Sequence, residues 1–159
     1  MATGKSTAPR PPRDRERTSR PVSPAREARA RAALESLEPS LADREARLDP
    51  ERRVRLHHEC ARLLEELGRP ADARPHYERA TEPEALHLPA LAGLRRVLGR
   101  AGELEAVVDA LALETARSQD GRRQAELEHQ RGHLLERLGH RDAAMDAVAR
   151  AAALSPTEV

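Results

Sequence analysis

The chain has 159 residues, with 28 Lys and Arg, 27 Asp and Glu, and 1% aromatic residues. One Tyr without Phe or Trp excludes a conventional mixed core, so any core must consist of Leu, Ala and Val, which favours helices. The single Cys excludes an intramolecular disulfide, and no apolar run is long enough for a membrane span or a secretory signal. We therefore expect an all-α, cytoplasmic protein, and we attribute its preference for Arg over Lys to a GC-rich bacterial genome.

Residues 1–24 contain five of the 12 prolines and no Leu, so we expect a disordered tail. Nine basic and three acidic side chains give residues 1–31 a net charge of +6, whereas the rest of the chain carries −5. Such a tail is either a solvated terminus or a tether that is attracted to nucleic acid or an anionic surface. It has no aromatic side chain for base stacking, so sequence-specific nucleic-acid binding is not expected.

The sequence of residues 25–49 predicts two short helices. The first covers 25–37 and ends near Pro39, because proline disrupts a helix interior, and a shorter one follows over 41–48. Their apolar stripe is thin, so we expect them to cap the next module instead of folding alone.

Three helical hairpins are predicted within 50–156, followed by a short tail over 157–159. Asp49 is a good N-cap, and Pro50 suits the first helical position, where no amide hydrogen is needed. In each hairpin a glycine ends the first helix, and an apolar stripe marks the second. The hairpins cover about 50–83, 88–117 and 120–156, and their turn glycines are Gly68, Gly102 and Gly139, which are 34 and 37 residues apart.

This pattern resembles the tetratricopeptide repeat (TPR) family, whose period is 34 residues. The matching residues are Ala61, Gly68, Ala73, Tyr77 and Ala80 in the first unit, Gly102, Val107 and Leu111 in the second, and Gly132, Gly139, Ala144, Val148, Ala151 and Pro156 in the third. The second unit departs from the pattern, because Arg95 replaces a small residue and Val107 and Glu114 replace Ala, so we expect looser or shifted packing there. The resemblance implies a right-handed superhelical solenoid of antiparallel hairpins, with a generic helical bundle as the alternative.

Residues 57–60, His-His-Glu-Cys, are the densest group of potential metal ligands, but consecutive helical side chains point about 100° apart. We expect Cys60 to face the core and no metal to bind. His129 and His133 are spaced as in zinc proteases, yet Gln130 stands where the general base would be. With no phosphate-binding loop, nucleophile elbow or paired carboxylates, we expect neither catalysis nor a cofactor.

The resemblance implies a protein-interaction adaptor or scaffold, whose first helices line a concave groove for an extended or helical partner segment. The family's groove positions correspond here to Arg55, His58, Arg62, Glu65 and Glu66, then Ala92, Arg96 and Arg100, then Glu126, His129, His133, Glu136 and Arg137. We expect Arg62, Arg96 and Arg100 to bind carboxylates of an acidic partner, a solvated face with nearby Glu residues being the alternative. His129 and His133 would make the groove sensitive to pH between about 6 and 7.

No clear solvating helix follows Pro156 in this sequence. We therefore expect the apolar side of Ala147, Val148 and 151–154 to be partly uncovered, and we expect a homodimer through this end or docking on a larger assembly. A structural subunit whose repeats pack on their own kind is a further alternative.

Overall fold

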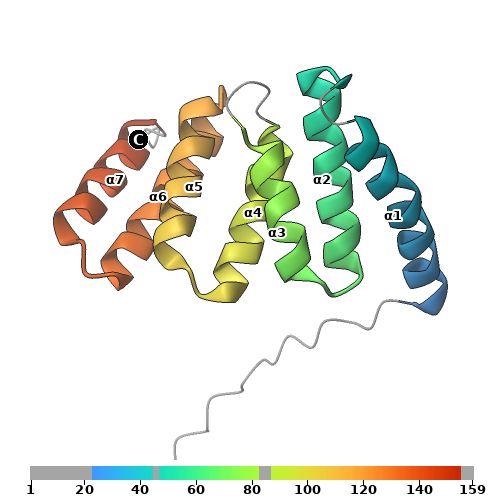
Figure 1. Cartoon of the computed structure of the whole chain (residues 1–159). Helices are drawn as coiled ribbons and strands as arrows, with labels where there is room; N and C mark the ends of the chain where they lie inside the picture. Colours follow the sequence, from blue (N-terminus) through green and yellow to red (C-terminus); the bar gives the residue numbers. More distant parts are fainter. Residues whose placement is uncertain (1–22, 45–46, 83–86, 155–159) are drawn as a thin grey trace, which may run out of the picture.

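The computed structural model describes residues 23–44, 47–82 and 87–154. These residues form helices and no strand, in the order α1 (Pro24–Arg44), α2 (Pro50–Glu66), α3 (Pro70–Ala80), α4 (Leu88–Ala101), α5 (Leu104–Arg117), α6 (Gly121–Arg137) and α7 (Arg141–Leu154). The helices stand side by side in chain order, each antiparallel to the next, with α1 at one end of the row and α7 at the other (Figure 1). The predictions for the basic tail up to residue 22, for Pro156 and for 157–159 lie outside the described residues.

The prediction of two short helices within 25–49 is wrong, because α1 is a single helix that continues past Pro39 to Arg44. Its buried side chains Ala30, Leu34 and Leu41 recur every four or seven residues, which places them on one helical face. Breaking the helix at Pro39 would remove Leu41 from that face. An interior proline destabilises a helix by about 3 kcal/mol, and burial of one Leu side chain stabilises the fold by roughly 1.5–3 kcal/mol. Packing of α1 against α2 therefore offsets the effect of Pro39.

The predicted start and stop signals of the hairpins are confirmed. The Asp49 carboxylate accepts a hydrogen bond from the Arg52 amide at 2.9 Å, which caps α2 at Pro50. The three turn glycines are the residues with positive φ among those described, at 71°, 80° and 84° for Gly68, Gly102 and Gly139. This left-handed conformation is strained for other residues and ends each first helix.

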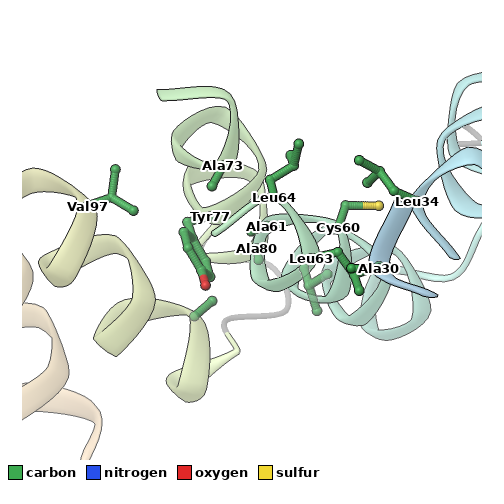
Figure 2. Close-up of a cluster of buried hydrophobic side chains, with 12 residues drawn as sticks. Ala30, Leu34, Cys60, Ala61, Leu63, Leu64, Ala73, Tyr77, Ala80 and Val97 are labelled. Atoms are coloured by element: carbon green, nitrogen blue, oxygen red, sulfur yellow. The ribbon is translucent and has the colours of Figure 1, made fainter. Parts of the chain in front are cut away.

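The largest part of the core joins α1, α2, α3 and α4 around Tyr77, whose side chain is 1% exposed. Figure 2 shows the ring of Tyr77 between Val97 of α4 and the small side chains of Ala61 and Ala80. Cys60 is also fully buried, as predicted, and burial raises the pKa of its thiol to about 11. Two smaller clusters continue the core through α4 to α7.

The second hairpin packs less closely than the other two, as its departures from the repeat pattern predict. Val107 and Leu111 are nevertheless buried, at 8% and 1% exposure. The space between α4 and α5 that small residues would close is filled by Arg95 and Glu114, whose charged groups lie 2.9 Å apart.

Candidate functional site

The groove residues predicted from the sequence lie on α2, α4 and α6, the first helices of the three hairpins. Most of them are exposed, and His58, Ala92 and the two glutamates of α2 are half-buried. The structure divides them into an arginine–glutamate network on α2 and α4 and an apolar hollow between α6 and α7.

Glu65 is the centre of the network. Its Oε2 accepts hydrogen bonds from the Tyr77 hydroxyl at 2.6 Å and from Arg96 Nη2 at 2.7 Å, and its Oε1 accepts from Arg100 Nη1 at 3.2 Å. The Glu65 side chain is only 10% exposed. Burial alone would raise its pKa, but the hydrogen bonds from Arg96 and Tyr77 outweigh burial, so the pKa of Glu65 is lowered. Glu65 therefore stays ionised and joins α2, α3 and α4.

Arg62 has partners within its own helix. Its guanidinium donates to Glu59 Oε1 at 2.7 Å and also to Glu66, which in turn accepts from Arg26 of α1 at 3.1 Å. The interpretation of this arginine as part of a solvated face with Glu neighbours three and four residues away agrees with these pairs. Arg62 is thus paired with two carboxylates, whereas Arg96 and Arg100 pair with the single carboxylate of Glu65.

His58 is half-buried beside the network instead of open to solvent. Its ring centre lies 4.6 Å from that of His87 and 6.0 Å from that of Tyr77. Burial, followed by the charge of the neighbouring His87, lowers the pKa of His58, and burial also lowers the pKa of His87. Both rings are therefore held neutral near pH 7.

The remaining groove residues of α2 and α6 are exposed. Arg55 lies 3.5 Å from Glu51 one turn away, and Arg137 ends α6. His129, His133 and Glu136 line one wall of an open hollow of about 650 Å³, and α7 lines the other. Its α7 wall consists of Arg141, Ala144, Met145, Val148, Ala149 and Ala152.

Two features of this region were not predicted from the sequence. Glu65 was placed in the groove as a surface residue, but its partners lie 31 and 35 residues away on α4, where no local pattern reveals them. Gly93 of α4 faces the Tyr77 ring so closely that an added Cβ would lie 2.3 Å from two ring carbons. A glycine inside a predicted helix was the available signal, because it costs about 1 kcal/mol relative to Ala.

The histidines and the cysteine of residues 57–60 do not converge. His57 points to α3, where its Nδ1 lies 3.1 Å from Nδ1 of His76, whereas Cys60 lies in the core. Within 23–44, 47–82 and 87–154, no group of three His, Cys, Asp or Glu side chains is placed to hold a metal ion. Among the same residues, no helix is long and apolar enough to cross a membrane.

Stacked antiparallel hairpins with a glycine turn in each define a helical-repeat solenoid, and comparison with known proteins identifies its type. No protein-family model and no curated protein sequence matches this chain. The structure is similar to crystal structures of MamA, with a TM-score of 0.56 and 19% identity over 82% of this chain and 71% of MamA. It is also similar to YrrB, a TPR protein with an unusual peptide-binding site, with a TM-score of 0.55 and 20% identity.

The likeness to YrrB covers 83% of this chain and 63% of YrrB. A third similar structure is a Podosopora anserina kinesin light chain with nearly identical TPR-like repeats. Its TM-score is 0.55, with 20% identity over 86% of this chain and 78% of that one. At this level of identity the likeness concerns the fold, and the chain has a TPR-like solenoid, as the turn-glycine spacing predicts.

Proposed function

We propose that this chain is a protein-interaction scaffold that binds a segment of a partner protein on the face formed by α2, α4 and α6. The TPR-like fold supports this function, because stacked hairpins present a continuous surface of first helices to a ligand. One of the similar structures is a TPR protein with a peptide-binding site. Adaptor function, without catalysis or a cofactor, is part of this proposal.

The excess of arginines over carboxylates around Glu65 is the observation that supports an acidic partner. Two guanidinium groups, those of Arg96 and Arg100, share this one carboxylate. Their side chains are 53% and 61% exposed, and each guanidinium has five N–H donors, of which Glu65 accepts one. Arg96 also donates to the Ala92 carbonyl and the Tyr77 hydroxyl, which leaves further donors on both arginines. Glu65 holds both groups in place, so a partner carboxylate meets oriented donors and loses less entropy on binding.

Arg62 has a smaller part in the proposed site than the sequence suggested. Glu59 and Glu66 already engage it, whereas Arg96 and Arg100 are directed across to the neighbouring hairpin. We therefore assign the binding of partner carboxylates chiefly to Arg96 and Arg100, with Arg62 as a flanking charge. Arg55, His129, His133 and Arg137 remain proposed contacts along the same face.

The test is a titration of the full chain with a short polyglutamate peptide and with its polyglutamine counterpart. The variant is Arg96→Gln/Arg100→Gln, which removes both charges while keeping side-chain length. We expect the wild type to bind polyglutamate and the variant to bind at least about tenfold more weakly, because charge-assisted hydrogen bonds contribute roughly 1.5–3 kcal/mol each. Polyglutamine should not bind detectably.

The matched control is Arg79→Gln/Arg117→Gln, which makes the same change in net charge at exposed positions on α3 and α5, outside the proposed face. It should bind polyglutamate like the wild type. Equal weakening in both double variants would mean that only net charge matters, and unchanged binding in the Arg96/Arg100 variant would remove these residues from the proposal.

A tether function for the basic tail would give a different result. Attraction to nucleic acid or an anionic surface falls steeply with salt and does not depend on Arg96 or Arg100. Binding of the full chain to duplex DNA should therefore be tested over the same salt range. Tight binding that removal of residues 1–22 abolishes would favour that alternative.

A further inference from the structure

A pair of histidine rings lies beside the arginine–glutamate network. His58 of α2 precedes Arg62 by one helical turn and Glu65 by two turns, so these three side chains share one stripe of the helix. The ring centre of His58 lies 4.6 Å from that of His87, the residue directly before α4. A proton that binds to this pair therefore adds positive charge next to the network.

The groups that face His58 from the surrounding helices carry mostly positive charge or none. They are Glu59 and Arg62 of α2, Tyr77 of α3, His87 at the start of α4, and Arg96 of α4. Glu59 is the carboxylate in this set, and it already accepts two hydrogen bonds from Arg62, at 2.7 and 3.1 Å. The surroundings of His58 therefore favour its neutral form.

Arg96 connects the histidine pair to the site proposed for partner carboxylates. Its guanidinium donates to Glu65 at 2.7 Å and to the Tyr77 hydroxyl at 3.5 Å, and the Tyr77 ring is the neighbour of His58. The charge of Arg96 adds to burial and to the charge of His87 in lowering the pKa of His58. A carboxylate that binds Arg96 would offset this charge, so it would raise the affinity of His58 for a proton.

The two rings do not take up two protons in the same pH range. Two positive charges on rings whose centres are 4.6 Å apart repel each other, so the rings titrate as a coupled pair. Burial lowers the pKa of His87 as well, and the charge of Arg55 adds to this effect. The pair therefore binds about one proton in mild acid, and the second proton binds at lower pH.

Arginines alone would not make the proposed site sensitive to pH. A guanidinium stays charged throughout the range in which histidine titrates, so Arg96 and Arg100 keep their charges in mild acid. Coupling between two ligands is reciprocal, so a carboxylate that raises the proton affinity of the histidine pair is itself bound more tightly when the pair is protonated. A pH response of partner binding would therefore report on histidines near the arginines.

We propose that binding of an acidic partner segment at Arg96 and Arg100 is coupled to the uptake of about one proton by His58 and His87, so that mild acid strengthens the complex. This coupling rests on the proposed function, because it concerns a segment bound at the same site. It adds a regulatory property, since the scaffold would hold its partner more tightly as the pH falls below neutrality.

Titration of the full chain with a short polyaspartate peptide, at about pH 7.5, 6.5 and 5.5 and constant ionic strength, tests the coupling. Asp carboxyl groups titrate near pH 3.9, so the peptide keeps its charge over this range. The dissociation constant of the wild type should fall roughly three- to tenfold from the highest to the lowest pH, as one added charge near a carboxylate predicts. Calorimetry in two buffers of different ionisation enthalpy should show proton uptake on binding.

Two double variants locate the titrating groups. His58→Gln/His87→Gln keeps polar side chains but cannot take up the proton, so its affinity for polyaspartate should not change with pH. The matched variant is His129→Gln/His133→Gln, which removes two histidines of α6 that line the hollow between α6 and α7. It should keep the wild-type change with pH.

A measurement on the wild type needs no substitution near the core. NMR titration of the His58 ring protons, with and without polyaspartate, should show that the peptide raises the pKa of His58 by an amount that matches the change in affinity. The titration covers the pH range in which circular dichroism shows the helicity found at neutral pH.

The possible failures are distinguishable. Binding of polyaspartate with the same affinity at every pH, or an unchanged His58 titration, would overturn the coupling and leave the proposed function standing. A wild type that binds the peptide at no pH would overturn both. A pH dependence that persists in His58→Gln/His87→Gln, or that disappears in His129→Gln/His133→Gln, would assign the proton uptake to other groups and refute the role of this pair.

Discussion

Arg95 and Glu114 form an ion pair between α4 and α5, with Arg95 Nε 2.9 Å from Glu114 Oε2. Their side chains are 17% and 9% exposed, at two positions where the TPR pattern has small residues. Glu114 also accepts a hydrogen bond from Arg123 of α6 at 2.8 Å, and Arg95 donates to Gln130 of α6 at 3.1 Å. Two departures from the repeat pattern thus compensate each other and connect the second hairpin to the third.

Replacing Glu114 and replacing Arg95 should lower the free energy of unfolding by different amounts. Glu114→Ala leaves two arginines without their shared carboxylate and should lower the free energy of unfolding by about 3 kcal/mol. Arg95→Ala should cost less, about 1–2 kcal/mol, because Arg123 still compensates Glu114. The double variant should be more stable than Glu114→Ala, since it removes the buried charge and restores small residues. Urea unfolding checks this order, and a double variant as unstable as the two single effects combined would refute the compensation.

Gly93→Ala should destabilise the protein although it replaces a helical glycine with the best helix former. The new Cβ would lie 2.3 Å from the Tyr77 ring, and such overpacking costs roughly 1–3 kcal/mol. Gly99→Ala is the control in the same helix, because nothing lies within 4 Å of its added Cβ. That change should stabilise by about 0.5–1 kcal/mol. Thermal unfolding should therefore shift in opposite directions, and a shift of the same sign would contradict the close contact.

His58 and His87 predict a loss of stability in mild acid. Burial lowers the pKa of both below the ordinary value of 6.5, so the unfolded chain binds protons that the folded chain does not. Their contribution to the free energy of unfolding is present above pH 6.5 and is lost as the pH falls through their lowered pKa values in the folded state. The melting temperature should fall between about pH 7.5 and 5.5, and less so in His58→Gln/His87→Gln. His140→Gln, at an exposed position, should behave like the wild type.

Tyr77→Phe isolates the hydroxyl that binds Glu65, since the ring remains in the core. We expect a loss of about 1.5–3 kcal/mol in the free energy of unfolding, the value of one hydrogen bond to a charged partner. The pKa of Glu65 should also rise, because the Tyr77 hydrogen bond is one of the contacts that lower it. NMR titration of the Glu65 carboxyl carbon measures this rise, and an unchanged titration would mean that the arginines alone set the pKa.

The sequence was informative where structure depends on local pattern. The turn glycines and the Asp49-Pro50 start signal depend on backbone conformation and capping, which neighbouring residues determine. Buried Ala73 and Tyr77 likewise follow from helical spacing. The error at Pro39 has the opposite cause, because burial of Leu41 by tertiary packing offsets a local penalty that was visible in the sequence.

The candidate site was less accessible to sequence reasoning, because its key contacts join distant segments. Placement of Arg96 and Arg100 on one face followed from the family resemblance, but their shared carboxylate, Glu65, is a long-range contact. The Arg95 and Glu114 positions were recognised as unusual, whereas their pairing required knowing that α4 and α5 place them opposite each other.

Affinity capture from native cell extract, with mass spectrometry, tests the central claim that the arginine cluster on α4 binds a partner protein. The baits are the full chain, its Arg96→Gln/Arg100→Gln variant and the Arg79→Gln/Arg117→Gln control. We predict that the wild type and the control retain the same protein, that the Arg96/Arg100 variant loses it, and that polyglutamate competes for it. Equal retention by all three baits, or capture that nuclease and high salt abolish, would contradict the claim.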